Sequence, residues 1–106
     1  MEKITTVDEI SIGGMKSFII KDKEILIANV DGNFFAMDNR CSHMGGNLSD
    51  GTLDGDVVVC PRHGSRFNIK TGEAVQGPKI LVIRLSTKKL NTYPLKIQEN
   101  DIMIDV

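Results

Sequence analysis

The sequence has few residues that bind metals through sulfur or nitrogen. Its 106 residues include two cysteines and two histidines. Two cysteines form at most one disulfide, whereas small secreted scaffolds usually carry several. A disulfide-stabilised extracellular scaffold is therefore disfavoured, and in a reducing compartment paired Cys and His residues are explained more readily by metal binding.

Long apolar runs and a strong net charge are also absent. Runs such as "ILVI" (residues 80–83) fall far short of the roughly 20 residues that cross a bilayer, and no signal peptide opens the sequence. Thirteen basic and 14 acidic residues give a formal net charge of -1, which is too small to gather nucleic acid or anionic lipid. We expect a cytoplasmic protein that binds neither.

The remaining composition is that of an ordinary folded domain. Hydrophobic residues make up 41% and charged residues 25% of the chain, a balance typical of globular proteins. The length suits one hydrophobic core, and no repeat or linker divides the chain. We expect a single domain over residues 1–106.

Helical periodicity is missing, and short apolar runs separated by turn residues predict an all-β fold. Four turn signals indicate hairpins: "KDK" (21–23), "DGN" (31–33), "LDGD" (53–56) and "KTG" (70–72). Three further strands are expected in "ILVIRL" (80–85), "NTYPLKIQ" (91–98) and "IMIDV" (102–106). Pro94 should begin its strand or lie at a sheet edge, because proline cannot donate a ladder hydrogen bond. The only helical candidate is a turn around "TVDEI" (6–10).

Both cysteines and both histidines lie in two matched boxes, "CSHMGG" and "CPRHGS". The pattern is C-x-H, sixteen residues, then C-x-x-H, formed by Cys41, His43, Cys60 and His63. Three structures are compatible with it. A disulfide would leave the histidines without a role, a tetrahedral Cys2His2 zinc site would use all four residues, and a [2Fe-2S] cluster would place the cysteines on one iron and the histidines on the other.

These boxes, the intervening "LSDGTLDGDVVVC" and the following "RFNIKTGEAVQGP" closely resemble the Rieske ferredoxin family. The resemblance covers almost the whole chain and is most specific over residues 39–78. It implies a small antiparallel β-sandwich with an inserted cluster-binding subdomain at about 39–78 and one [2Fe-2S] cluster per chain. Cys41 and Cys60 would hold the inner iron, and His43 and His63 the outer iron. C-x-H is also tighter than the ligand pairs of common zinc sites.

The resemblance also implies roles for residues around the cluster. Glycines at 45, 46 and 64 would let the backbone pass close to sulfide and offer N–H groups to sulfur, although turn chemistry alone also explains glycine there. Pro78 would belong to a loop that covers the cluster, or to an ordinary turn. Met44 would contact a partner at the tip, or pack inward.

Four positions bear on the reduction potential. High-potential relatives carry cysteines that form a disulfide at the places of Gly46 and Arg62, and a Ser and a Tyr that donate hydrogen bonds to cluster sulfurs. Ser65 matches the serine, but Phe67 replaces the tyrosine. We predict a potential in the lower half of the Rieske window of about -150 to +300 mV.

The chain lacks the parts of a complete oxidoreductase. A Rieske oxygenase needs a second iron held by two further histidines, and a nicotinamide reductase needs a G-x-G-x-x-G fingerprint; neither is present. We expect a one-electron carrier without its own substrate turnover, passing electrons from a reductase to a terminal oxidoreductase such as a Rieske oxygenase through transient contact near His43 and His63. The alternatives are a small subunit of a larger redox enzyme of nitrite-reductase type, and a zinc-stabilised interaction module.

Two features bear on the partner. Arg62 and Arg66 would steer an acidic partner, or serve only solubility. The segment "KILVIRLSTKKLNTYPLKI" (79–97) is longer than in the short ferredoxins of bacterial dioxygenases that the chain otherwise resembles, which leaves the partner open.

Overall fold

The computed structural model describes residues 1–41, 46–62, 64–76, 79–80, 83–84 and 89–106. Within these ranges the chain forms antiparallel β-sheets and two 3-10 turns, η1 (Val7–Glu9) and η2 (Leu48–Asp50). The predicted all-β fold and the predicted turn around residues 6–10 are confirmed. None of the described helical segments has the length and hydropathy needed to span a membrane.

The central sheet has the strand order β11-β4-β3-β2. Its members are β2 (Met15–Ile20), β3 (Lys23–Val30), β4 (Asn33–Asp38) and β11 (Thr92–Tyr93). Both predicted hairpins in this region form. Lys21 and Asp22 turn the chain with φ of 49° and 63°, and Asp31 and Gly32 with 54° and 93°, which are the positive values that two-residue hairpin turns require.

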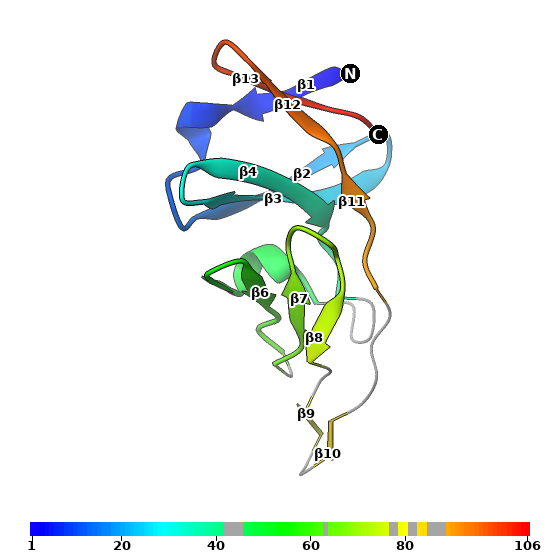
Figure 1. Ribbon diagram of the computed structural model, residues 1–106. Helices are drawn as coiled ribbons and strands as arrows, with labels where there is room; N and C mark the ends of the chain where they lie inside the picture. Colours follow the sequence, from blue (N-terminus) through cyan, green and yellow to red (C-terminus); the bar gives the residue numbers. More distant parts are fainter. Residues whose placement is uncertain (42–45, 63, 77–78, 81–82, 85–88) are drawn as a thin grey trace.

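A second sheet has the order β1-β13-β12 and contains both ends of the described chain (Figure 1). Its strands are β1 (Glu2–Thr6), β12 (Leu95–Gln98) and β13 (Asp101–Ile104). Pro94 separates β11 from β12, and β12 is an edge strand, as predicted for this proline. The sequence reading did not predict β1, because "EKITT" is largely polar and only pairing with β13 makes it a strand.

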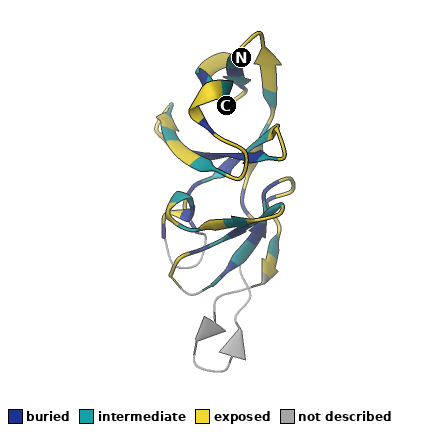
Figure 2. Cartoon of the chain, turned by 90° about the vertical axis from the view of Figure 1, so that its left-hand side faces the viewer, coloured by how far each residue is buried: buried dark blue, intermediate teal, exposed yellow. Residues whose placement is uncertain are grey.

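These two sheets pack face to face as the predicted sandwich, and β3 explains how. Ile25 and Ile27 contribute to a core with residues of β13, whereas Leu26 and Ala28 contribute to a second core on the other face. All four are fully buried, so β3 is covered on both sides and its apolar run is continuous rather than alternating. The two buried layers can be followed in Figure 2.

A third sheet, of order β5-β6-β7-β8, supplies the second core. Its strands are β5 (Thr52–Asp54), β6 (Val57–Val59), β7 (Arg66–Asn68) and β8 (Ala74–Gln76). The chain leaves the sandwich after β4 and returns at β11, which pairs with β4. This sheet is therefore an insertion between two neighbouring strands, and it lies at the end of the molecule opposite the termini (Figure 1).

The run "ILVIRL" does not form the single strand predicted for it. β9 (Lys79–Ile80) instead pairs antiparallel with β10 (Ile83–Arg84), with Ile80 opposite Ile83 and Lys79 opposite Arg84. The pair projects beyond the inserted sheet, away from the termini (Figure 1).

Candidate metal centre

The two cysteine boxes form loops of equal size with the same closing hydrogen bond. The N–H of Cys41 donates to the Gly46 carbonyl at 2.9 Å, and the N–H of Cys60 donates to the Ser65 carbonyl at 2.7 Å. In each loop the backbone N–H of the cysteine thus donates a hydrogen bond to the carbonyl of the residue five positions later. The sequence showed two similar motifs, and the structure shows that both are closed in the same way.

Both cysteine side chains are buried, and neither is part of a disulfide. Cys41 and Cys60 are each 2% exposed and form no disulfide. They belong to the core between the central and inserted sheets, which also contains Phe67. Two thiols from different loops therefore face one interior region, and the disulfide alternative is not the state of this structure. His43 and His63 lie outside the described residues, so their predicted roles remain predictions.

Ser65 stands out among the buried polar residues. Its side chain is 0% exposed, and its Oγ is the one buried side-chain polar atom in the described part of the chain without a hydrogen-bond partner. Leaving a hydroxyl in this state costs about 1–3 kcal/mol. Such an atom requires an explanation, and its position at the end of the second cysteine loop suits a donor to a group held by that loop.

The glycines at 46 and 64 owe their identity to different constraints. A Cβ on Gly46 would lie 3.2 Å from the Arg62 side chain and 3.3 Å from Cys60 Sγ, so the first loop passes close to the second cysteine. Gly64 has φ of 74°, which is turn geometry that other residues adopt at a cost. Close approach therefore explains Gly46, and turn chemistry suffices for Gly64.

Residues just before Cys41 fix the start of the first loop. Arg40 donates to both carboxylate oxygens of Glu24, at 2.8 and 3.1 Å, and this interaction raises the pKa of Arg40. The buried Asn39 bonds backbone to backbone with Glu24 and Leu48 and accepts a hydrogen bond from the Ser49 N–H. The loop is thereby tied to β3 and to its own far side.

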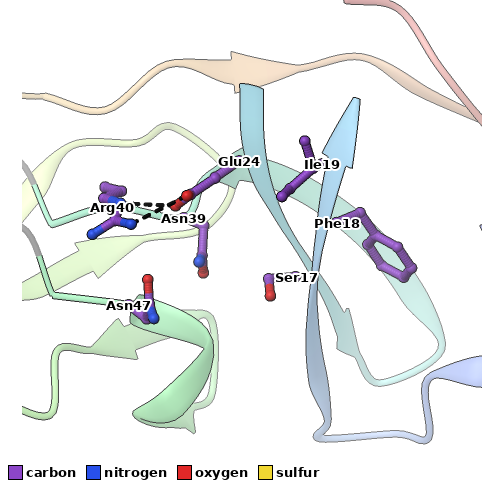
Figure 3. A pocket seen from close by; sticks show the side chains of 7 residues that line it. All are labelled: Ser17, Phe18, Ile19, Glu24, Asn39, Arg40 and Asn47. Carbon is purple, nitrogen blue, oxygen red and sulfur yellow. Dashed lines mark hydrogen bonds and ion pairs between the residues drawn. The ribbon is translucent and has the colours of Figure 1, made fainter. Parts of the chain in front are cut away.

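Figure 3 shows the Glu24–Arg40 pair beside an open pocket of about 420 Å³. Asn39 and Asn47, which flank the first cysteine loop in the sequence, line this pocket together with Ser17 of β2. The sequence reading missed Glu24 and Asn39. Spacing gives no signal for them, because Glu24 lies sixteen residues from Arg40 and meets it only through the β3–β4 pairing.

A second anchor lies where the chain returns to the sandwich. The hydroxyl of Tyr93 donates to Asp38 Oδ1 at 2.5 Å, and the Asn91 N–H donates to Asp38 Oδ2 at 3.0 Å. Burial, helped by the hydrogen bond to Asp38 and by its charge, raises the pKa of Tyr93 to about 12. Since Asp38 ends β4, this contact joins the two strands between which the third sheet is inserted.

The other predicted positions divide into three groups. Phe34, Phe35 and Met37 are packing residues of the two cores, as expected. Arg66 is paired with Asp54 at 3.3 Å, whereas Arg62 is exposed and forms no ion pair within the described chain. Met44, Gly45 and Pro78 lie outside the described residues.

The described residues fit a sulfide-bridged metal cluster. They offer two unbridged thiols from two matched loops and a buried hydroxyl without an acceptor. The sequence profile of the Rieske [2Fe-2S] domain matches residues 2–94. The chain belongs to the Rieske [2Fe-2S] domain family. It carries one [2Fe-2S] cluster, as the sequence predicted.

Proteins similar to this chain include ferredoxins. The ferredoxin component of the naphthalene 1,2-dioxygenase system of Pseudomonas aeruginosa is 36% identical over 98 residues, which are 92% of this chain and 88% of that protein. The Sphingomonas yanoikuyae B1 ferredoxin matches with a TM-score of 0.80 and 31% identity, covering 98% of this chain and 96% of that one. A chain from the complex of reduced oxygenase and oxidized ferredoxin in carbazole 1,9a-dioxygenase matches with a TM-score of 0.83 and 27% identity, over 96% of this chain and 89% of that one.

Proposed function

We propose that this Rieske protein is a one-electron carrier that passes electrons from a reductase to the terminal oxygenase of a dioxygenase-type system. The observation that carries the proposal is the pair of matched loops that bring two buried, unbridged thiols to one interior site. Relatives that are ferredoxin components of dioxygenase systems support it, as does the similarity to a chain of an oxygenase–ferredoxin complex.

When bound, the cluster accepts and releases a single electron at a potential that its histidine ligands raise above that of all-cysteine ferredoxins. We assign Cys41 and Cys60 as thiolate ligands of one iron, and His43 and His63 as ligands of the other. Burial of both cysteines keeps water from the thiolate side. An electron would therefore leave on the histidine side, and a partner would contact that side transiently.

The chain's own residues would hold the cluster and tune it rather than catalyse a reaction. Ser65 would donate its unpaired hydroxyl to a sulfur, and the backbone at Gly46 passes close to Cys60 Sγ. We propose no substrate turnover by this chain alone, a single domain over 1–106 with the cluster held by residues 39–78, and a cytoplasmic location, where free thiols persist.

Anaerobic purification followed by iron and sulfide analysis tests the cofactor and its ligands. We expect two irons and two acid-labile sulfides per chain, and a reduced-state paramagnetic signal with an average g below 2. Changing His43 or His63 to Cys should abolish or alter that signal. Stoichiometric zinc without sulfide would instead support the interaction module.

Electron delivery needs a separate test. The protein is reduced with dithionite, freed of excess reductant and mixed with the oxygenase of carbazole 1,9a-dioxygenase as an acceptor. Reoxidation at a rate that saturates with oxygenase concentration supports a carrier that docks. A rate unaffected by oxygenase, with the cluster intact, would contradict this part of the proposal and favour a subunit of another redox enzyme.

A further inference from the structure

The small net charge of the chain hides an uneven distribution. Residues 39–90, from the first cysteine loop to the return to the sandwich, contain eight Lys and Arg against four Asp and Glu. The remaining residues contain five Lys and Arg against ten Asp and Glu. The first part therefore carries a formal charge of +4 and the second -5.

The fold turns this difference into a dipole along the molecule. The principal extents are 47 × 27 × 19 Å, and the inserted sheet lies at one end of the long axis with the β1-β13-β12 sheet at the other (Figure 1). The positive end is the end that holds both cysteines. Charges on one side of a protein steer an approaching partner even when the total charge is near zero.

Ion pairs within the described residues show which cations remain available. Three of the cations near the inserted sheet have acidic partners: Arg40 with Glu24, Arg66 with Asp54, and Lys70 with Asp56. Two others, Arg62 and Lys89, are exposed and form no ion pair in the described chain. Arg62, which the sequence did not distinguish from Arg66, is thus the arginine without an ion pair in the described chain.

Both uncompensated cations lie beside the cysteine loops. The Arg62 side chain lies against Gly46, where a Cβ would meet it at 3.2 Å and Cys60 Sγ at 3.3 Å. Lys89 lines a pocket of about 500 Å³ together with Cys41. The same pocket is lined by Asp22, Glu24 and Asp38 and by the cations Lys23 and Arg40, so Lys89 lies among charges of both signs. Arg62 therefore has the larger influence on an approaching charge.

We propose that the charge dipole orients this ferredoxin so that its cysteine-loop end meets an acidic surface of the partner protein, with Arg62 as the principal contact and Lys89 beside it. This rests on the carrier function proposed above and specifies the chemistry of the surface that receives the electron. Exposed charges of this kind act mainly on the rate of encounter.

Small redox probes of opposite charge test the dipole. The dithionite-reduced protein is oxidised by ferricyanide, a trianion, or by tris(phenanthroline)cobalt(III), a trication. In each case one electron leaves the protein, giving ferrocyanide or the cobalt(II) complex. We expect rising salt to slow the ferricyanide reaction and to accelerate the cobalt reaction. The net charge of -1 would give the opposite signs, so the outcome separates local from total charge.

Variants that each remove one positive charge show which cation produces the salt dependence. Arg62→Gln should slow ferricyanide oxidation about threefold at low salt and converge with wild type at high salt, and Lys89→Gln should do so by a smaller factor. Lys96→Gln is the control, because Lys96 is also exposed and without an ion pair in the described chain, but lies on β12 in the opposite sheet. It changes the net charge equally and should alter the rate by less than about 1.3-fold.

A polymer mimics a charged protein surface. Poly-L-glutamate at low salt should cover the cysteine-loop end and slow oxidation by the cobalt complex, and Arg62→Gln should weaken this inhibition, whereas Arg62→Lys should retain it. Poly-L-lysine should bind the opposite end and leave the rate unchanged. If poly-L-lysine inhibits and poly-L-glutamate does not, the acidic-partner proposal is overturned.

These outcomes are distinct from failure of the carrier function. Protein that contains no cluster, or that no oxidant reoxidises, refutes the carrier proposal. Protein that exchanges electrons but shows the salt dependence of a negative surface refutes the dipole. If Arg62→Gln loses its cluster, as judged by visible absorbance, the Lys89→Gln protein provides the same comparison with Lys96→Gln.

Discussion

Replacing Ser65 by alanine tests the proposed site most directly, because the hydroxyl has no partner in the described protein. Its Oγ is fully buried at the end of the second cysteine loop, while its backbone carbonyl accepts the Cys60 N–H. The substitution removes only the oxygen and leaves that backbone bond in place. The substitution should therefore stabilise the protein without the cluster and lower the midpoint potential of the protein with the cluster.

In the absence of the cluster the hydroxyl is an unsatisfied buried group. Removing it should raise the free energy of unfolding by about 1 kcal/mol, since such a group costs about 1–3 kcal/mol and part of this is offset by the small void left behind. With the cluster bound, the same hydroxyl would donate to sulfur and favour the more negative reduced state. Losing a hydrogen bond of about 1 kcal/mol lowers a one-electron potential by roughly 40 mV.

Two measurements are needed. Voltammetry of the holoprotein gives the midpoint potential of wild type and Ser65→Ala, and urea unfolding of the apoprotein gives the change in stability. Ser17→Ala is the control, because Ser17 is an exposed serine on β2. It should leave both quantities unchanged.

A more stable apoprotein together with a lower midpoint potential of the holoprotein supports the role of the Ser65 hydroxyl as a hydrogen-bond donor to the cluster. An unchanged midpoint potential in Ser65→Ala would refute the donor role. A lower stability of the apoprotein would show that Ser65 already has a partner in the protein, and the reasoning from its unpaired state would then be wrong.

Three further predictions concern the potential, the close packing and the tyrosine. Phe67→Tyr should raise the midpoint potential by up to roughly 40 mV if the new hydroxyl reaches a sulfur; a fall measured by voltammetry would contradict this. Gly51→Ala should lower the free energy of unfolding by about 2–3 kcal/mol, because its Cβ would overlap a backbone oxygen of β6. Gly55→Ala is the control: at φ of 62° with open space around it, it should cost only about 1 kcal/mol of backbone strain. Equal losses of stability in urea unfolding would show that close packing at Gly51 is unimportant. Tyr93 is the only tyrosine, so absorbance at alkaline pH should report its titration directly, with a pKa near 12. The stability that this raised pKa contributes should be complete below the ordinary pKa of 10.0 and should be lost as pH rises through about 12. Asp38→Asn should lower the pKa of Tyr93, and a wild-type titration midpoint near 10 would contradict the hydrogen bond.

Local signals in the sequence predicted much of the sandwich. "KDK" and "DGN" predicted the turns at Lys21–Asp22 and Asp31–Gly32, and the residues adopt the positive φ angles that such turns need. Pro94 predicted a strand boundary. β1 and the β9–β10 pair were not predicted, because the first depends on a partner about 100 residues away and the second on the run pairing with itself.

The sequence by itself determined the kind of centre, since the spacing of two Cys–His boxes limits which atoms one cluster can gather. Tertiary structure decided what surrounds it. Glu24 reaches Arg40, and Tyr93 reaches Asp38 across 55 positions, only because antiparallel pairing brings them together. The same packing pairs Arg66 with Asp54, while Arg62 forms no ion pair within the described residues. Residue type and local spacing can be read directly from the sequence, whereas burial and charge compensation depend on which distant segments come into contact.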